Sequence, residues 1–394
     1  MTLPSTATPR LYYLDWLRVS AMIGIFFFHN ARFYDAFSDW HVRNATTNTG
    51  ATVFVGFLSI FIMPIFFLIA GAGVFLALRL RNSGQFVAER STRLLIPLIF
   101  GMLAIVVPQA YYEAVHHGVP LGQYNLFQVY LLYLNSLPEL NWFHLWFLAY
   151  LFVFSLVMLP IFVRWTKSGK SVITRLASVS ANPWVLLPLL ILPLALAETF
   201  SNPGGFWGNR GQGGWSIGAY VLFFIAGYLI FANPRIMETV KKLGWVMLAI
   251  GVVAGIATLV FFFPQLTDLP AHFGSGAYAI AQLLHAITAW GWLLAILGLG
   301  YRFLNRSGKV LSYANEAVLP FYILHQTVII VIGFYVVQWN TGVGLKYLVI
   351  STASFVTIML IYEFLVRRLN VFRFLFGMRL NRPGEKAKAV LAKE

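Results

Sequence analysis

Long apolar runs alternate with short polar stretches along almost the whole chain. A helix needs about 20 predominantly apolar residues, and at least about 17, to cross the hydrocarbon core of a bilayer. Ten runs reach or approach that length, and they lie near residues 12–34, 51–78, 94–110, 142–164, 183–199, 215–232, 244–263, 277–300, 311–337 and 345–366. The pattern predicts an all-α polytopic membrane protein, built as a bundle of about ten transmembrane helices.

Residues 120–140 are apolar only in patches. Polar residues and a proline interrupt this stretch at Gln123, Asn125, Gln128, Asn135, Pro138 and Glu139. We therefore expect a re-entrant or surface-lying segment there, not an eleventh span. The first run has the length of a signal peptide, but no convincing small-residue cleavage site follows it, so we expect a retained transmembrane helix.

Composition supports a membrane protein. Of 394 residues, 59% are hydrophobic and only 10% are charged, which is more apolar surface than a soluble fold can bury. The formal net charge of +15 would suggest a nucleic-acid partner in a soluble protein, but here the cations cluster between the apolar runs, as the positive-inside rule requires. We expect no nucleic-acid partner. The chain has no cysteine, which excludes a thiolate nucleophile, and its scattered histidines predict no metal site.

The distribution of lysine and arginine predicts the orientation. With the N-terminus in the cytoplasm, 23 of the 28 Lys and Arg residues fall on the cytoplasmic side of the ten-helix arrangement. An eleventh span at 120–140 would turn every later basic loop outward. We therefore predict cytoplasmic N- and C-termini, with a basic tail over about residues 367–394 along the anionic inner leaflet.

The first apolar run carries Asp15, Arg18 and His29. Ionisable groups at membrane depth are costly and mark candidate functional sites. Arg18 and His29 are eleven residues apart, about three helical turns plus 20°, so they share a helix face and lie ~16 Å apart along the axis. The pair suits an anionic donor near one surface and chemistry deeper inside. The alternative is a hydrogen-bonded packing histidine and a snorkelling arginine.

Arg90 and Arg93 precede the third run. Three residues apart on a helix, they share a face, and at the helix N-terminus that the sequence predicts here, free amides and the dipole would add attraction for a phosphate. Positive-inside topology alone would also place two arginines at this position.

Three more histidines and a glutamate lie within or at the ends of later runs: His144, His285, His325 and Glu363. Each taken singly is more often a hydrogen-bonding packing residue than a catalyst. Four imidazoles in one bundle, including His29, favour a shared polar cavity, because lipid-facing ones would be costly.

The predicted outer loops combine aromatics, amides and carboxylates that could stack on and hydrogen-bond a sugar. An ordinary aromatic belt with polar loops is the alternative. His41, His116 and His117 lie in these loops, and we expect them to matter far less for chemistry than His29.

Three motifs point to a family. Arg18 and His29 are separated by ten residues; Arg90-Ser91-Thr92-Arg93 leads into Leu94-Leu95-Ile96-Pro97; and His144 begins His-Leu-Trp-Phe-Leu. In these motifs the chain resembles the acyltransferase-3 membrane acyltransferases, over nearly its whole length. Some further runs look most like the members that succinylate osmoregulated periplasmic glucans, namely Tyr13-Leu14-Asp15, Leu311 to His325, Tyr362-Glu363 and Phe374-Leu375-Phe376-Gly377.

The resemblance implies a single membrane acyltransferase domain over residues 1–394 in the bacterial inner membrane. It would take a succinyl or acetyl group from cytoplasmic acyl-CoA, with no metal, and deliver it to a hydroxyl of an extracytoplasmic glycan, with a periplasmic glucan as the expected acceptor. His29 would be catalytic with Arg18 as its partner, and Arg90 and Arg93 would bind the CoA phosphates. We also expect substrate contacts from five residues: His144, His325, Trp146, Asp15 and Glu363.

Two questions stay open at this point. His29 could act as general base towards the acceptor hydroxyl, or carry the acyl group as an acyl-imidazole. Ten helices with buried Arg, His and Glu would also suit a proton-coupled transporter or an exporter of a glycan or glycolipid. Release of free CoA would distinguish an acyltransferase from a transporter.

Overall fold

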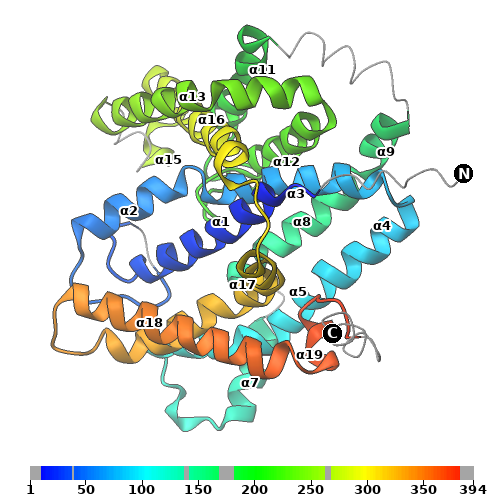
Figure 1. The fold of residues 1–394 in the computed structure, drawn as a ribbon. Coiled ribbons are helices and arrows are strands. Elements are labelled where there is room, and N and C mark those ends of the chain that lie inside the picture. The colour runs from blue at the N-terminus through cyan, green and yellow to red at the C-terminus, as the bar shows by residue number, and fades with distance from the viewer. Residues whose placement is uncertain (1–9, 38–39, 137–141, 168–181, 262–267, 382–394) are drawn as a thin grey trace, which may run out of the picture. The chain divides into compact units, whose positions relative to one another are not determined.

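The computed structural model describes residues 10–37, 40–136, 142–167, 182–261 and 268–381 (Figure 1). All regular structure within these ranges is helical, and no strand occurs in them. The predicted all-α class is therefore confirmed.

Six helical stretches in the described ranges are long and apolar enough to cross a bilayer: Thr49–Leu78, Pro183–Phe200, Pro234–Phe261, Gly276–Leu304, Lys309–Val336 and Val343–Val366. Two further pairs of helices qualify together, but each is bent at a short break: Ser83–Ile105 with Val107–His116 by 44°, and Phe143–Val157 with Leu159–Thr166 by 52°. The structure thus supports a multi-pass membrane protein with six to eight clear spans.

The remaining two of the ten predicted spans are α1 (Tyr12–Ala31) and α12 (Ile217–Ala232). Both form helices, but α12 has only 16 residues and α1 contains several polar residues that lower its hydropathy. The count of ten transmembrane helices is therefore not established by length and composition.

The helices form two compact units, each made of three chain segments. Unit 1 comprises residues 1–23, 59–80 and 161–315. Besides α12 and the starts of α1 and α17, its helices are α3 (Ile62–Leu78), α9 (Leu159–Lys167), α11 (Pro183–Phe200), α13 (Pro234–Phe261), α15 (Leu269–His272) and α16 (Gly276–Leu304).

Two pairs of helices pack tightly in unit 1, α13 with α16 and α3 with α12. At the second contact, a Cβ atom added to Gly71 would lie 1.9 Å from the carbonyl oxygen of Phe224, and one added to Gly227 would lie 2.0 Å from that of Leu68. Only glycine permits backbones to approach this closely, which is how helices commonly pack in membranes.

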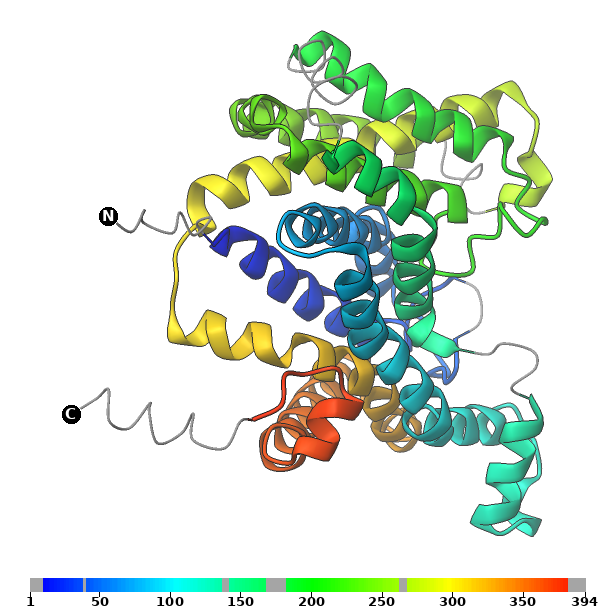
Figure 2. The same cartoon turned by 90° about the vertical axis from the view of Figure 1, so that its right-hand side faces the viewer.

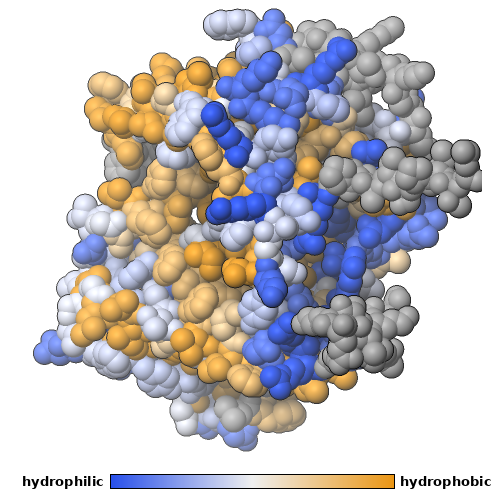
Figure 3. All heavy atoms as spheres, viewed as in Figure 1, coloured by the Kyte–Doolittle hydropathy of each residue, from blue (hydrophilic) through white to orange (hydrophobic). Residues whose placement is uncertain are grey.

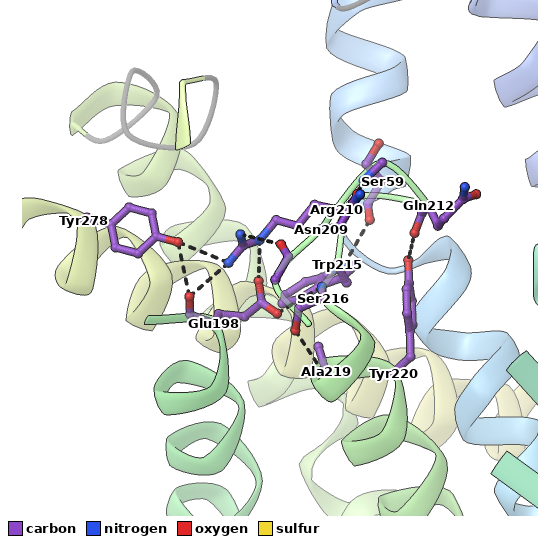
Figure 4. A network of polar contacts seen from close by, with 12 residues as sticks. Ser59, Glu198, Asn209, Arg210, Gln212, Trp215, Ser216, Ala219, Tyr220 and Tyr278 are labelled. Atoms are coloured by element: carbon purple, nitrogen blue, oxygen red, sulfur yellow. Dashed lines mark hydrogen bonds and ion pairs between the residues drawn. The ribbon is translucent and has the colours of Figure 1, made fainter. Parts of the chain in front are cut away.

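The loop after α11 closes around a buried ion pair in unit 1 (Figure 4). Arg210 Nε lies 2.7 Å from Glu198 Oε2, and the same guanidinium donates to the hydroxyl of Tyr278 at 3.1 Å. The backbone N–H of Ser216 donates to Glu198 Oε1 at 3.1 Å. The charge of Arg210 is therefore used within the fold to hold this loop.

Unit 2 comprises residues 24–58, 81–160 and 316–394. Its elements begin with the end of α1 and continue with α2 (Thr49–Ser59), α4 (Ser83–Arg90), η1 (Ser91–Leu95), α5 (Ile96–Phe100), η2 (Gly101–Ile105), α6 (Val107–His116), η3 (Leu121–Gln123), α7 (Leu126–Ser136), η5 (Phe143–Leu145) and α8 (Trp146–Val157). The last part of the chain adds most of α17 (Lys309–Val336), α18 (Val343–Ile361), η6 (Tyr362–Val366) and α19 (Asn370–Leu375).

The stretch from 120 to 140 forms two short helices, η3 and α7, within its described part. At 11 residues α7 is too short to span a bilayer. Figure 2 shows the chain changing direction between α4 and α6, with α7 beside α6. Pro138 and Glu139, which we expected to interrupt this stretch, lie outside the described residues.

Apolar side chains are exposed on helices of both units. Examples are Val253 and Val260 on α13, and Leu348, Val356 and Leu360 on α18. Figure 3 shows hydrophobic side chains gathered over α18. Exposed apolar surface of this extent is what a lipid-facing helix requires.

Candidate active site

Three histidines that are far apart in sequence meet in unit 2. His29 comes from the last turn of α1, His144 from η5 and His325 from α17. The ring centroids of His29 and His325 are 5.1 Å apart, and those of His144 and His325 are also 5.1 Å apart. The structure therefore brings together three of the four imidazoles that were expected to share a polar cavity.

Backbone carbonyls fix the rings of the two deeper histidines. Nε2 of His144 lies 3.0 Å from the carbonyl oxygen of Ile323, and Nδ1 of His325 hydrogen-bonds the carbonyl of Tyr322. A carbonyl oxygen can only accept, so these two nitrogens carry the protons of the neutral rings. The lone pairs are then on Nδ1 of His144 and Nε2 of His325, which are free to accept a hydrogen bond or a proton.

Four buried ring nitrogens in this cluster have no hydrogen-bond partner among the described residues. They are Nδ1 of His29, Nδ1 of His144, Nε2 of His325 and Nε1 of Trp40. Buried polar groups are rarely left without a partner, so a group of such atoms in one place indicates a site for a polar ligand or water. His144 and His325 are 5% and 0% exposed, while His29 is only partly buried. His29 is therefore the least buried of the three histidines.

The segment between α1 and α2 folds back over His29. The indole of Trp40 stacks on the His29 ring, with centroids 5.1 Å apart and an interplanar angle of 15°. The Arg32 guanidinium lies 5.1 Å from the Trp40 ring and pairs with Asp35 at 3.0 Å. Burial raises the pKa of Asp35, while Arg32 and the amide of Phe37 act against that rise. These contacts hold Trp40 in place over the catalytic candidate.

A buried lysine ties the same segment to α18. Nζ of Lys346 donates to Oδ1 of Asn44 at 2.8 Å and to the carbonyl of Val337 at 2.7 Å. The backbone N–H of Asn44 in turn donates to the carbonyl of Phe33 at 2.9 Å. The segment is therefore anchored on both sides of Trp40.

His41 lies in a loop, as expected, and its ring contacts those of Trp40 and Phe143 beside the cluster. Its Nδ1 lies 2.9 Å from Oε2 of Glu113, and its Nε2 lies 2.8 Å from the amide nitrogen of Gln326 and 3.2 Å from that of Gln109. A carboxylate, an imidazole and two amides thus link the Trp40 segment to α6 and α17. Because His41 lies in a loop, no helical periodicity in the sequence could have revealed this.

The residue before His144 has an unusual backbone. Phe143 has φ +46°, which is strained for a bulky side chain and is seen most often at functional sites. Its ring lies 5.5 Å from that of His41. The strained turn thus presents His144 and packs against His41 at the same time.

Arg18 and Asp15 lie near the start of α1. Asp15 pairs with Arg10 at 2.8 Å and with Arg18 at 3.4 Å, and Arg18 also contacts Oδ1 of Asn315 at 3.2 Å. The structure therefore gives Arg18 polar partners within unit 1 and keeps it three turns from His29 along α1.

Arg90 and Arg93 do not lie at a helix N-terminus, so that part of the sequence interpretation is wrong. The helix begins at Ser83, where the side chain of Asn82 accepts from the backbone N–H of Gln85 in a capping box. Arg90 lies against the ring of Phe86 at 4.9 Å, and Arg93, in the π-turn η1, lies 3.5 Å from Glu89. Helix-terminal amides therefore contribute nothing here, and any attraction for phosphate comes from the guanidinium charges.

The other predicted site residues have contacts of their own, with side chains other than the three histidines. Glu363 pairs with Arg367 at 2.9 Å and Arg368 at 3.9 Å. Trp146 is buried at the start of α8, and its ring contacts that of Tyr150. His285 belongs to unit 1, where its ring stacks on Trp215 at 4.2 Å. Within the described ranges, no group of three or more histidine and carboxylate side chains is arranged to hold a metal ion.

Comparison with known proteins identifies the family. The family model for the acyltransferase 3 domain matches residues 11–363. The chain belongs to the acyltransferase-3 family. Its curated relatives include the Glucans biosynthesis protein C of Salmonella paratyphi B, which is 26% identical over 350 residues, covering 84% of this chain and 85% of the relative. The same protein of Salmonella heidelberg is 25% identical over 356 residues, with the same coverage. No solved structure matches the chain.

Membership of the acyltransferase-3 family makes the protein a membrane acyltransferase. The match runs through both compact units, from α1 to η6. It favours an acyltransferase over the transporter or exporter that buried charges alone would allow.

Proposed function

We propose that the protein is an O-acyltransferase that moves a succinyl or acetyl group from cytoplasmic acyl-CoA to a hydroxyl of an extracytoplasmic glycan. The acceptor is a periplasmic glucan, and residues 1–394 act as one acyltransferase domain in the bacterial inner membrane. Family membership and the name of the relatives support the class of reaction. The observation that carries the proposal is the group of four unpartnered buried ring nitrogens around His29.

His29 is the catalytic residue of this proposal. Its imidazole removes the proton from the acceptor hydroxyl as the oxygen attacks the thioester carbonyl, and the C–S bond then breaks. The thiolate of CoA leaves with the proton that the imidazole has taken, so the histidine returns to its neutral form. In the alternative sequence of steps, His29 attacks first, the C–S bond breaks, and the CoA thiolate leaves with the proton of the imidazole. The acceptor hydroxyl then cleaves the acyl-imidazole and returns its proton to the ring.

The other candidates support His29. The lone pairs of His144 and His325 accept hydrogen bonds from the acceptor or take the proton from His29, and Trp40 limits the space around the ring. Trp146 contributes a substrate contact from the start of α8. Asp15 orients Arg18, which guides the anionic donor, and Glu363 orients Arg367 at the end of η6.

Release of free CoA tests the reaction directly. Purified protein in nanodiscs, given succinyl-CoA or acetyl-CoA and a periplasmic glucan, is expected to release CoASH and to raise the mass of the glucan by one acyl group per event. Hydrolysis without glucan modification, or no CoASH at all with folded protein, would contradict the proposal.

Arg93→Ala is expected to weaken acyl-CoA binding by about tenfold to over a hundredfold. A charge-assisted contact with phosphate contributes roughly 1.5 to 3 kcal/mol. Arg93→Lys should recover only part of the affinity, because lysine lacks the planar fork. Calorimetry with CoA measures the effect, and unchanged affinity in a folded Arg90→Ala/Arg93→Ala variant would show that these arginines do not bind the donor.

The proposed orientation predicts a labelling pattern. The chain has no cysteine, so single cysteines report accessibility without background. Gly122→Cys and Gly205→Cys should react with an impermeant maleimide on intact spheroplasts, and Ser307→Cys only after permeabilisation. Labelling of Ser307→Cys in intact spheroplasts would contradict the proposed orientation and place this residue on the periplasmic side.

Glu113→Gln is expected to lower acyl transfer by about tenfold, because His41 loses a charge-assisted partner while the shape of the side chain is kept. The loss should fall mainly on kcat, since the pair acts through the position of Trp40 and His29. His117→Gln is the matched control, because His117 is exposed at the end of α6. Equal rates of acyl transfer for Glu113→Gln and wild type would show that the His41–Glu113 pair does not contribute to the reaction.

A further inference from the structure

Charged side chains gather along the first half of the long helix that runs from Ser83 to Ile105. Glu89 lies 2.9 Å from Arg81 and 3.5 Å from Arg93. Arg379, which comes from the C-terminal segment, is within electrostatic range of Arg93, as is Arg81. Glu89 thus pairs with two guanidiniums, and Arg379 adds a third positive charge near Arg93. Three positive charges against one negative charge leave two uncompensated within this group.

An excess of cations in one place favours an anionic ligand. Like charges held together repel one another, and the repulsion disappears when an anion binds among them. The side chain of Arg93 is 47% exposed and that of Arg81 is 34% exposed, and Arg379 is exposed as well. A dissolved anion can therefore reach all three guanidiniums.

The segment that supplies Arg379 has a fixed conformation. The buried side chain of Arg373 donates to the carbonyl of Arg379 at 2.6 Å and to the carbonyl of Arg367 at 3.0 Å, and it pairs with Glu316 at 3.0 Å. A reciprocal pair of hydrogen bonds between Asn370 and Asn381 closes the segment. Arg379 is therefore anchored to α17 and to the end of η6.

Gly377 brings this segment against the helix that carries Arg93. Its φ of +67° lies in the left-handed region. A Cβ atom at this position would lie 2.9 Å from the carbonyl oxygen of Arg93 and 2.8 Å from Cγ of Pro97. Glycine is thus required twice, by the backbone conformation and by the close approach to the π-turn.

We propose that Arg379, together with Arg81 and Arg93, binds the phosphate groups of the acyl donor, and that residues 370–381 present Arg379 to this site. The inference rests on the proposed use of acyl-CoA. Guanidinium groups suit this ligand because their planar forks bind phosphate oxygens in pairs. Gly377 and Arg373 are positioning residues, since they act through Arg93 and Arg379.

Binding of CoA and of pantetheine, which has no phosphate, tests the proposal in full-length protein in nanodiscs. Arg379→Ala should weaken CoA binding by about tenfold, leave pantetheine binding unchanged, and reduce the salt dependence of CoA binding. Arg302→Ala, at an exposed arginine of α16, is the matched control and should bind both ligands as wild type does.

Gly377→Ala provides a second variant that keeps every charge. It should also weaken CoA binding while sparing pantetheine, whereas Gly342→Ala, where an added Cβ meets open space, should change neither. The proposal is overturned if folded Arg379→Ala binds CoA as wild type does while Arg93→Ala binds it more weakly. In that case acyl-CoA still stands as the proposed donor. Equal losses for CoA and pantetheine would also overturn it. Failure of the wild-type protein to bind CoA would reject the proposed donor itself.

Discussion

A His29→Gln enzyme is expected to transfer acyl groups about 10² to 10⁴ times more slowly than wild type, the usual contribution of general-base assistance. Glutamine fills much of the same space and can hydrogen-bond, but it cannot take a proton or form an acyl-imidazole. The loss should therefore appear in kcat, with expression and thermal unfolding in detergent close to wild type. A coupled assay of CoASH release measures it.

The control for His29→Gln is a histidine that lies on the surface, away from the imidazole cluster. His117→Gln changes an exposed imidazole at the end of α6 and should leave the rate unchanged, whereas His41, which contacts Glu113 and the Trp40 ring, no longer qualifies as a control. A His29→Gln enzyme with a near-normal rate would make His29 a packing residue and leave His325 or His144 as the base.

Glu198→Gln is expected to destabilise the protein by about 3 to 5 kcal/mol, because it leaves the charge of Arg210 buried without its partner. The side chains of Glu198 and Arg210 are 1% and 8% exposed. The double variant Glu198→Gln/Arg210→Met should recover much of this loss, since it removes both charges. Unfolding in a mild detergent, followed by near-ultraviolet circular dichroism, measures the free-energy differences.

An exposed ion pair provides the comparison for Glu198. Glu238 and Lys241 lie 2.6 Å apart on α13, with 60% of the glutamate side chain exposed, so Glu238→Gln should change stability little. Similar small effects for Glu198→Gln and Glu238→Gln would show that the Glu198–Arg210 pair does not stabilise the loop between α11 and α12.

The hydrophobic pattern predicted the helices well because lipid requires long apolar runs. Each of the ten predicted runs contains a helix or a bent pair of helices. The boundaries were less predictable, because a polar helix start carries no hydropathy signal. Ser83–Arg90 extends two turns before the predicted start, and its capping residue Asn82 was not recognised. That missed cap is why Arg90 and Arg93 were wrongly placed at a helix terminus.

The site was predictable only where it lies on helices. His29, His144 and His325 attracted attention because polar side chains in apolar runs are costly, and they do meet in the structure. Trp40 and His41 come from a loop, where only the folded chain shows that the Trp40 ring stacks on His29 and that the His41 ring contacts Trp40. The sequence also could not distinguish a ligand-binding charge from a paired one, as the ion pairs of Asp15 and Glu363 illustrate.

Mass spectrometry of a periplasmic glucan after incubation with acyl-CoA tests the central claim most directly. With wild-type protein in nanodiscs, the glucan should gain the mass of one or more acyl groups, in proportion to the CoASH released. With His29→Gln, both products should fall together by at least about 10²-fold. Acylated glucan formed at a near-normal rate by His29→Gln, or no acylation by folded wild-type protein, would contradict the account.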